Sequence, residues 1–364
     1  MKILALEPFF GGSHRLFLEG YRRFSRHEIE IATMPARKWK WRMRGAALHY
    51  ADLFRGRWRE FDLLLASDFL GLADLVALAP ADLAKIPKAL YFHENQLTYP
   101  YREESERDYQ FGFTNITSCL AADQIFFNSA FHREEFLGAI EPFLKRLPDL
   151  RPPGVGRAIA EKSGVLPLGL DLDAIRAKPR PERRGPPTIL WNHRWEFDKN
   201  PELFFETLFR LKTEGLNFRL AVAGEHFRET PPIFDHARET LRDRIVHFGF
   251  LESRAAYLGL LRSCDIVCST AIHEFFGVSV LEAVAAGCRP VLPNRLSYPE
   301  MLPPETHNRY LYAADAAFPG ALQRAIEKAP SFRPRDAERL ADTFGWKELA
   351  PRYDDAFDAM PRAT

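Results

Sequence analysis

The sequence predicts an α/β protein with two Rossmann-like domains, each a doubly wound parallel sheet. Short apolar runs alternate with helix-length amphipathic segments along the whole chain, as crossover connections between parallel strands require. The runs are continuously apolar, which is typical of strands covered by helices on both faces. A length of 364 residues suits two domains at roughly 150 residues each.

Composition and charge exclude several classes of protein. A hydrophobic fraction of 46% with 27% charged residues is typical of a globular chain and too apolar for a disordered one. The net charge is +1, from 50 Lys and Arg against 49 Asp and Glu, which argues against a chain that is basic throughout. The four cysteines form no Cys-x-x-Cys pair, so we expect neither a disulfide framework nor a zinc knuckle, but buried thiols in a reducing compartment.

Two series of alternating elements define the domains. The predicted strands are residues 2–8, 27–34, 62–67, 88–95 and 124–129 in the first series, and 188–193, 218–224, 244–250, 265–270 and 289–294 in the second. A Pro- and Arg-rich stretch between them is typical of an exposed linker. We therefore predict an N-terminal domain over 1–172, a linker over 173–187, a C-terminal domain over 188–345, and a final helix over 346–364 that can cross back to the N-terminal domain.

Nothing in the sequence indicates a targeting or membrane segment. The apolar run at the N-terminus is broken by Glu7 and Pro8, so it does not fit a signal peptide. No stretch approaches the roughly 18 to 20 apolar residues of a spanning helix. We therefore expect a cytoplasmic protein without stable membrane association, and the sequence assigns it no oligomeric state.

Polar residues follow two strands of the predicted N-terminal sheet, where ligands bind in open parallel sheets. The pair Gly11-Gly12, with His14, follows the first strand, and paired glycines let a backbone approach a ligand and turn helix N–H groups toward an anion. A plain tight turn is the alternative. The run His93-Glu94-Asn95-Gln96 follows the fourth strand, where polar residues are costly to bury unless they are hydrogen-bonded or functional. Here the alternative is a helix N-cap beside a core histidine whose hydrogen bonds are satisfied.

Arg194 and Lys199 follow the first strand of the second series. A guanidinium and an ammonium ahead of a helix N-terminus suit the binding of a diphosphate. The alternative is structural, with Asp198 or Asn200 capping the next helix.

The most specific pattern is Glu274 and Glu282, eight residues apart around Phe276-Gly277-Val278. A helix that begins near Gly277 would offer free N–H groups to a phosphate, with Glu282 inside the helix and Glu274 on the loop before it. Carboxylates only accept hydrogen bonds, so they suit a hydroxyl-rich ligand. The alternative, a solvated charge pair, is disfavoured because Glu282 lies within the apolar run VSVLEAVAAG.

The net charge conceals a basic segment at residues 35–60, which carries +6, so the rest of the chain sums to about −5. Its cations are Arg37, Lys38, Lys40, Arg42, Arg44, Arg55, Arg57 and Arg59, and its tryptophans are Trp39, Trp41 and Trp58. Cations and aromatic faces are what an RNA loop with unstacked bases requires. On a helix, Arg37, Lys40 and Arg44 would share one face. The alternatives are a solvated helix whose tryptophans are buried, and a membrane-surface helix, which the lack of a long apolar face disfavours.

These motifs carry a family resemblance that covers most of the chain. Through Arg194, Lys199 and the E-x7-E of Glu274 and Glu282, the second half resembles glycosyltransferase family 4 enzymes of GT-B architecture. The first half resembles the tRNA-queuosine mannosyltransferase family through the strings EPFFGGSHRLFLEGY, MPARKWKWRMRGAALHYA, YFHENQLTYPY and FGFTNITSCLAADQIFFNSAFHREEF. The resemblance implies transfer of mannose from GDP-mannose to the cyclopentenediol of queuosine in a tRNA anticodon, with retention of anomeric configuration.

The resemblance also implies roles for individual residues. Arg194 and Lys199 would hold the diphosphate, and Glu282 would bind the nucleotide ribose. We expect the remaining nucleotide-sugar contacts from Gly11, Gly12, Phe250, Leu251, Glu274, Phe276, Gly277 and Val278. We expect the acceptor tRNA to meet His14, Arg37, Lys38, Trp39, Lys40, Trp41, Arg42, Arg44, Glu94, Asn95 and Gln96.

The expected mechanism is a front-face substitution, with His93, Glu274, Arg194 and Lys199 as the catalytic set. The departing diphosphate accepts the proton of the attacking hydroxyl while fixed cations and helix N–H groups stabilise its charge. His93 would contact the donor sugar and position that hydroxyl. We expect no metal and no other cofactor, and domain closure around the donor with the linker as hinge. A family 4 enzyme with a lipid or small-metabolite acceptor, and a catalytically silent RNA-binding relative, remain as alternatives.

Overall fold

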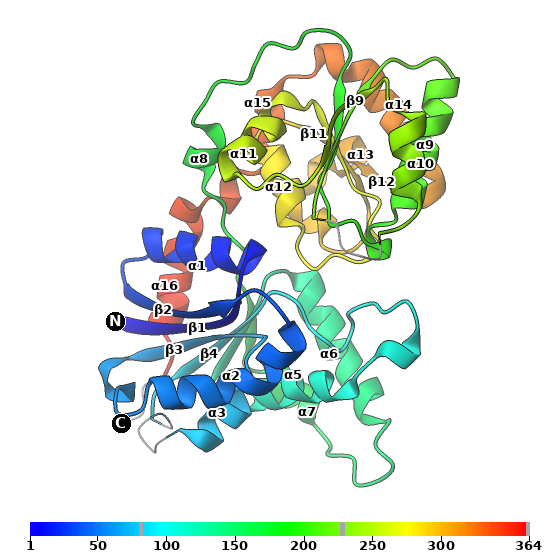
Figure 1. Ribbon diagram of the computed structural model, residues 1–364. Helices are drawn as coiled ribbons and strands as arrows, with labels where there is room; N and C mark the ends of the chain where they lie inside the picture. The colour runs from blue at the N-terminus through cyan, green and yellow to red at the C-terminus, as the bar shows by residue number, and fades with distance from the viewer. Residues whose placement is uncertain (80–82, 84, 226–229, 362–364) are drawn as a thin grey trace. The chain divides into compact units, whose positions relative to one another are not determined.

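The computed structural model describes residues 1–79, 83, 85–225 and 230–361 (Figure 1). The chain divides into two compact units. The first comprises Met1–Leu170 together with Trp346–Thr364, and the second comprises Asp171–Gly345. Each unit contains one six-stranded sheet in which the described strand pairs are parallel, so the predicted α/β class with two parallel-sheet domains is confirmed.

The first unit has the strand order β2-β1-β3-β4-β5-β6. Its strands are β1 (Lys2–Phe10), β2 (Glu28–Pro35), β3 (Leu63–Ser67), β4 (Lys88–Phe92), β5 (Gln124–Phe127) and β6 (Ser163–Val165). Its helices are α1 (Gly12–Phe24), α2 (Trp39–Leu53), α3 (Leu72–Leu78), α5 (Tyr109–Ala121), α6 (Ala130–Leu144), α7 (Val155–Ala160) and α16 (Trp346–Asp358). Every residue of β3 and β4 is buried, as the continuously apolar sequence of these strands predicts.

Helix α16 packs on α1, far from it in sequence and drawn beside it in Figure 1. The Tyr21 hydroxyl donates to Asp354 at 2.7 Å. The Trp346 indole fills space that a side chain would need at two glycines, because a Cβ at Gly20 or Gly169 would lie 2.0 or 2.3 Å from it. The last helix is therefore an integral part of the first unit.

The second unit has the strand order β12-β11-β10-β7-β8-β9. Its strands are β7 (Thr188–Trp191), β8 (Arg219–Ala223), β9 (Ile245–Gly249), β10 (Ile266–Cys268), β11 (Arg289–Pro293) and β12 (Leu311–Tyr312). Its helices are α8 (Leu172–Arg176), α9 (Pro201–Thr213), α10 (Ile233–Thr240), α11 (Arg254–Ser263), α12 (Val278–Ala285), α13 (His307–Tyr310), α14 (Phe318–Lys328) and α15 (Pro334–Leu340). The short edge strand β12 has no counterpart in the sequence prediction.

The predicted linker at 173–187 is mostly exposed, yet its arginines hold it on the second unit. Arg176 donates to the Glu338 carbonyl at 2.5 Å, Arg180 to the Ala286 carbonyl at 2.6 Å and Arg183 to the Ala329 carbonyl at 2.8 Å. Carbonyls at helix ends lack partners within the helix, and arginine side chains satisfy them well. The arginines that led us to predict an exposed linker therefore bind this segment to the second unit through hydrogen bonds.

Each sheet has one point where the strand order reverses, between β1 and β3 in the first unit and between β7 and β10 in the second. Ligands of open α/β sheets bind beyond the carboxyl ends of the strands at such points. Glu7 and Asp68 lie at the first reversal, and His193 and Thr270 lie at the second. Of the predicted site residues, His14 contacts Glu7 at the first place and Lys199 contacts Thr270 at the second.

Two further expectations concern burial. All four cysteines are buried and unpaired, so the predicted buried thiols are confirmed. Among the residues described, no helix is both long enough and apolar enough to cross a bilayer.

Candidate active site

A buried ion pair between Glu7 and His14 lies at the carboxyl end of the first sheet. Glu7 is fully buried in β1, and its Oε2 lies 3.0 Å from Nδ1 of His14 in α1. Its Oε1 accepts from the Phe9 amide at 2.9 Å and from the Ser67 hydroxyl at 3.1 Å. A buried carboxylate is costly unless it is paired and hydrogen-bonded, and this one is both. Glu7 therefore fixes the position and the charge of His14.

His93 faces His14. Their ring centroids are 3.9 Å apart with 31° between the planes, and Phe69 stacks on His14 at 5.2 Å. His93 is 7% exposed, its amide donates to Asp68 at 2.9 Å, and neither of its ring nitrogens has a hydrogen-bond partner among the described residues. The alternative of a core histidine with satisfied hydrogen bonds is therefore wrong.

The two histidines carry different charges at neutral pH. Burial disfavours the charged form of His14, but Glu7, Asp68 and Glu94 outweigh burial and raise its pKa to about 9. Burial, with the nearby positive charge of His14, holds the pKa of His93 well below its usual 6.5. Burial also raises the pKa of Asp68 to about 8. The site therefore pairs an imidazolium with a neutral imidazole.

The turn that follows His93 is built by its own polar side chains. Asn95 is fully buried, and its Oδ1 accepts from the Leu97 and Thr98 amides at 2.9 and 3.0 Å. The Gln96 side chain donates to Glu94 at 3.1 Å. The predicted acceptor contact is therefore better suited to Glu94 and Gln96 than to Asn95, whose side chain shapes the turn.

Glu7, His14 and His93 are also the residues whose types and proximity fit a metal site. One ligand atom from each lies within 4.8 Å of the others. In the structure, however, Glu7 and His14 bind each other and the two imidazoles face each other. The three side chains thus form an ion pair beside a neutral ring. Sequence reasoning named His14 and His93 but not Glu7.

Lys199 is the centre of the polar group in the second unit. Its buried Nζ donates to the His273 carbonyl at 2.7 Å and lies 2.9 Å from Asp198 and 3.5 Å from Glu274. Burial opposes its charge, but the two carboxylates outweigh burial and raise the pKa of Lys199. Burial likewise opposes ionisation of Glu274, but Lys199 lowers the pKa of that carboxyl. The structure therefore brings Lys199 and Glu274 together as charged groups.

Arg194 lies nearer the surface, with its side chain 3.4 Å from Glu196. The capping alternative is confirmed for Asn200, whose Oδ1 accepts from the Leu203 amide at 3.4 Å at the start of α9. It does not hold for Asp198, which is buried beside Lys199. The role of Arg194 and Lys199 on a diphosphate stays a prediction.

Helix α12 begins at Val278 behind Gly277, so the predicted helix start is confirmed. Gly277 has a φ of +84°, and a Cβ there would lie 2.6 Å from the Met301 methyl, so glycine is required on both counts. Glu282 lies inside the helix and is 3% exposed, while Glu274 lies on the loop before it and accepts from the Phe276 amide at 3.4 Å. The alternative of a solvated charge pair is therefore wrong.

Arg254, in α11, forms an ion pair with Glu282. Its guanidinium lies 5.4 Å from the ring of Tyr257, whose hydroxyl accepts from Asn192 at 3.1 Å. Asn192 also donates to the Ser279 carbonyl at 2.7 Å, which links the end of β7 to α12. Arg254 thus holds in place the carboxylate that we expect to bind the ribose, and no sequence motif predicts this contact.

The remaining predicted nucleotide contacts are dispersed. Phe276 is buried with its ring 6.1 Å from that of Phe344, whereas Phe250 is largely exposed and Leu251 half-buried after β9. No hydrogen bond, ion pair or ring contact among the described residues joins Phe250 or Leu251 to the Lys199 group. Gly11 and Gly12 lie at the turn into α1, where a Cβ on Gly11 would lie 2.5 Å from the Ala36 side chain. Gly12 has a φ of +50° and open space where a Cβ would lie, so the two glycines fit a tight turn as well as a ligand contact.

The basic segment places one tryptophan and several cations in solvent. Trp41 is 75% exposed, and Trp39 packs 5.0 Å from Phe111. Lys40 lies over Trp39 at 5.6 Å and Arg44 over Phe111 at 5.2 Å. The exposed cations at the start of this segment are Arg37, Lys38, Lys40 and Arg44, with Arg42 half-buried.

Two expectations about this segment are wrong. Trp58 is 1% exposed and packs on Phe54, so it offers no face to a base. Lys38 adopts a left-handed conformation with φ 55°, so α2 begins only at Trp39 and Arg37 lies outside the helix. Lys40 and Arg44 remain four residues apart on one helical face.

Comparisons with known proteins agree on the family. Residues 2–170 match the family model described as tRNA-queuosine alpha-mannosyltransferase N-terminal, and residues 174–340 match that described as glycosyl transferases group 1. A tRNA-queuosine alpha-mannosyltransferase of Drosophila melanogaster is 41% identical, over 98% of this chain and 96% of that protein. A GDP-mannose-dependent alpha-(1-6)-phosphatidylinositol dimannoside mannosyltransferase of Mycobacterium tuberculosis is 25% identical over 69% of this chain and 62% of that one.

Solved structures share the fold. A glycosyltransferase from Rickettsia africae superposes with a TM-score of 0.70 at 15% identity, covering 99% of this chain and 98% of that one. Anabaena HepE in complex with UDP and glucose superposes with a TM-score of 0.67 at 14% identity, covering 99% and 100% of the two chains. With this fold and 41% identity to a full-length relative, the chain belongs to the tRNA-queuosine alpha-mannosyltransferase family, a family of GT-B glycosyltransferases.

Proposed function

We propose that the protein transfers mannose from GDP-mannose to queuosine in a tRNA anticodon loop, in the cytoplasm and with retention of anomeric configuration. The observation that carries the proposal is the 41% identity, over 98% of the chain, to a relative of that name. The charged groups at the strand reversals of both sheets support it, because they supply what a sugar transfer needs.

The second unit would bind the donor. Lys199 and Arg194, with the N–H groups at the start of α12, offer positive charge to the leaving diphosphate, where charge develops in the transition state. Glu282, held by Arg254, would accept from the ribose hydroxyls, and Glu274 from the sugar hydroxyls. Further contacts to the nucleotide sugar are proposed for Phe276, Gly277, Val278, Phe250, Leu251, Gly11 and Gly12.

The first unit would act on the hydroxyl groups. A neutral His93 with two unpartnered ring nitrogens can both donate to and accept from a hydroxyl, which suits contact with the sugar and the attacking group. His14, charged at neutral pH, can only donate from its remaining nitrogen. The departing phosphate would take the proton of the attacking hydroxyl, and the proposal assigns no metal or other cofactor to this step.

The start of α2 would bind the RNA. Exposed cations there can neutralise phosphates, and the exposed Trp41 indole can stack on an unpaired base of the anticodon loop. Glu94 and Gln96 would lie on the acceptor side. RNA loops are recognised through stacking and backbone charge, which is what this surface offers.

The deciding experiment incubates the protein with radiolabelled GDP-mannose and tRNA that contains or lacks queuosine. We expect label in queuosine tRNA only, loss of transfer in Glu282→Ala, and equal activity with EDTA or added Mn²⁺. Label in both tRNAs would contradict queuosine as acceptor, and dependence on metal would contradict a metal-free step.

A second acceptor class follows from the Mycobacterium tuberculosis relative, whose name specifies a phosphatidylinositol dimannoside acceptor and the same donor. A parallel assay replaces tRNA with vesicles that contain phosphatidylinositol mannosides. Label in lipid but not in tRNA would favour this second function. Binding of queuosine tRNA without transfer to either acceptor would favour a catalytically silent RNA-binding protein.

A further inference from the structure

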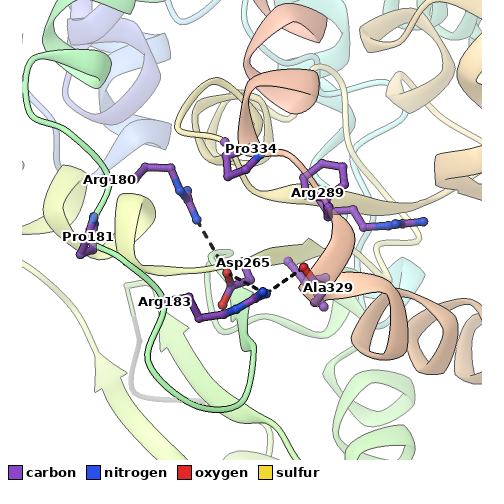
Figure 2. Close-up of a pocket in the computed structure, with 10 residues that line it drawn as sticks. Arg180, Pro181, Arg183, Asp265, Arg289, Ala329 and Pro334 are labelled. Atoms are coloured by element: carbon purple, nitrogen blue, oxygen red, sulfur yellow. Dashed lines mark hydrogen bonds and ion pairs between the residues drawn. The ribbon is translucent and has the colours of Figure 1, made fainter.

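A cavity of about 210 Å³ lies at the amino-terminal end of the second sheet (Figure 2). Arg180, Arg183 and Arg289 line it together with Asp265. Asp265 precedes β10 and Arg289 begins β11, so the cavity lies at the opposite end of these strands from the group around Lys199. It is therefore separate from the proposed donor site.

Arg289 is a buried cation at the start of β11. It is 9% exposed, its Nε has no hydrogen-bond partner, and no carboxylate among the described residues pairs with it. Its guanidinium lies 5.8 Å from the ring of Tyr310 and 5.5 Å from that of Phe332. Burial lowers the pKa of Arg289. Aromatic faces offset part of the cost of burying a charge, and an anion with good hydrogen-bond geometry would offset more of it.

A second cavity, of about 340 Å³, also borders Arg289. Arg309, Arg324 and Lys328 line it, and none of them pairs with a carboxylate in the described part of the chain. Arg324 and Lys328 are exposed and lie four residues apart on α14, so they occupy one face of that helix. Arg289 thus lines both cavities, and the other cations of both linings suit an anionic ligand.

Little negative charge balances this group. Asp265 lies 3.6 Å from Arg183 and 4.0 Å from Arg180. Arg180 and Arg183 otherwise donate to main-chain carbonyls, which carry no net charge. Six cations therefore surround the two cavities against one carboxylate of the cavity linings.

We propose that Arg289, flanked by Arg180, Arg183, Arg309, Arg324 and Lys328, forms a phosphate-binding site at the amino-terminal end of the second sheet. The planar guanidinium donates two parallel hydrogen bonds to a phosphate, and the flexible lysine adds a point charge. Two cavities that share one arginine suit two neighbouring phosphates. These belong either to a nucleic-acid backbone or to a small phosphorylated molecule, which share this chemistry.

The test measures pyrophosphate binding by isothermal titration calorimetry at fixed ionic strength, with GDP present in saturating amounts to occupy the donor site. Arg289→Met keeps the aliphatic stem against the two rings and removes the charge. Arg324→Gln with Lys328→Gln changes only exposed side chains. The matched control, Arg210→Gln with Arg242→Gln, removes two exposed charges of the same unit that line neither cavity.

We expect pyrophosphate affinity to fall about tenfold in Arg289→Met and in the α14 double variant, and to stay unchanged in the control. A second arm measures the tRNA binding constant at several salt concentrations. If the site binds a nucleic-acid backbone, the slope of the logarithm of the binding constant against the logarithm of salt concentration would be smaller by roughly two in the double variant. Loss of pyrophosphate affinity with an unchanged slope would instead assign the site to a small phosphorylated molecule.

Unchanged pyrophosphate affinity and unchanged tRNA slope in the α14 double variant would overturn the proposal. That variant decides the matter alone if circular dichroism shows that Arg289→Met does not fold. Because pyrophosphate is the probe, the result is independent of mannose transfer, and failure of the proposed function would leave this test intact.

Discussion

The Nδ1 atom of His14 lies 3.0 Å from Oε2 of Glu7, and both side chains are buried. This contact gives His14 a charge that burial alone would remove. That charge helps keep the adjacent His93 neutral. One carboxylate of β1 thereby sets the protonation of two histidines.

Replacing Glu7 with glutamine is expected to lower the pKa of His14 from about 9, because Glu7 supplies both a charge and a hydrogen bond that oppose the effect of burial. Histidine-labelled NMR titration would measure the shift, and mannose transfer would fall as the hydroxyl-binding groups lose their charge pattern. Glu19→Gln, on the exposed side of the same helix, is the control. A His14 pKa that stays near 9 in Glu7→Gln would contradict the assigned role of Glu7.

Stability should depend on pH through the same pair. The folded-state pKa of His14 is about 9 against 6.5 unfolded, so its contribution is complete below pH 6.5 and lost as pH rises through 9. The shift corresponds to about 3 kcal/mol. The raised pKa of Asp68, about 8, makes stability fall with rising pH as well, from about pH 4 to 8.

Urea unfolding followed at pH 6, 7.5 and 9 would measure this dependence. We expect the free energy of unfolding to decrease across the series in the wild type. In Glu7→Gln the part of this decrease that His14 contributes between pH 6.5 and 9 should shrink, while the part that Asp68 contributes up to about pH 8 remains. An equal decrease in both proteins would show that other groups cause it.

The proposed role of positive charge at the leaving diphosphate can be tested by mutating Arg194. Its side chain is near the surface, whereas Lys199 is buried between two carboxylates, so the change carries little risk to folding. We expect Arg194→Gln to lower kcat about 100-fold, as loss of one fixed positive group at a developing charge does. Arg210→Gln, which removes an exposed charge from α9, serves as the control. A kcat within threefold of wild type would remove Arg194 from the catalytic set.

In the proposed function Arg254 would affect donor binding through its ion pair with Glu282. We expect Arg254→Gln to raise KM for GDP-mannose about tenfold while kcat changes little, which is the pattern for lost ground-state binding. Arg254→Lys should restore part of the affinity, because a charge returns without the bidentate geometry. An effect on kcat alone would indicate that Arg254 contacts the reacting groups instead.

The start of α2 can be tested by binding. We expect Trp41→Ala to weaken tRNA binding about tenfold, and Lys40→Gln with Arg44→Gln to reduce the salt slope by roughly two. GDP binding should be unchanged in both. Arg55→Gln is the matched control from the same segment, because Arg55 already pairs with Asp52 at 3.0 Å. Equal tRNA affinity in all these variants would refute the assigned RNA surface.

The fold was predictable because buried parallel strands appear in the sequence as short, continuously apolar runs. The fully buried strands β3 (LLLAS) and β4 (KALYF) are examples. The start of α12 was predictable from Gly277, whose left-handed φ suits glycine. The two-residue β12 was not, because so short an edge strand depends on its neighbour β11 for its conformation.

Part of the site was predictable because a polar residue there interrupts an apolar pattern. His93 and Glu282 stand out in this way, and Glu7 and Asp68 would have done so under the same rule. Arg254 leaves no such trace, because it lies among ordinary surface residues and meets Glu282 across 28 positions of sequence. The burial of Trp58 depends on its packing against Phe54, which the composition of the segment does not reveal.

Helix α16, which begins at Trp346, completes the first unit, whose other part is Met1–Leu170. During synthesis, the ribosome must add the 175 residues of Asp171–Gly345 before this helix emerges. At 5 to 20 residues per second, that interval is roughly 10 to 35 seconds. During that interval Trp346 cannot fill the space beside Gly20 and Gly169, and the Tyr21 hydroxyl lacks its partner Asp354. The part of the protein made first is therefore the part finished last, and a nascent chain has a window in which chaperones can act on it.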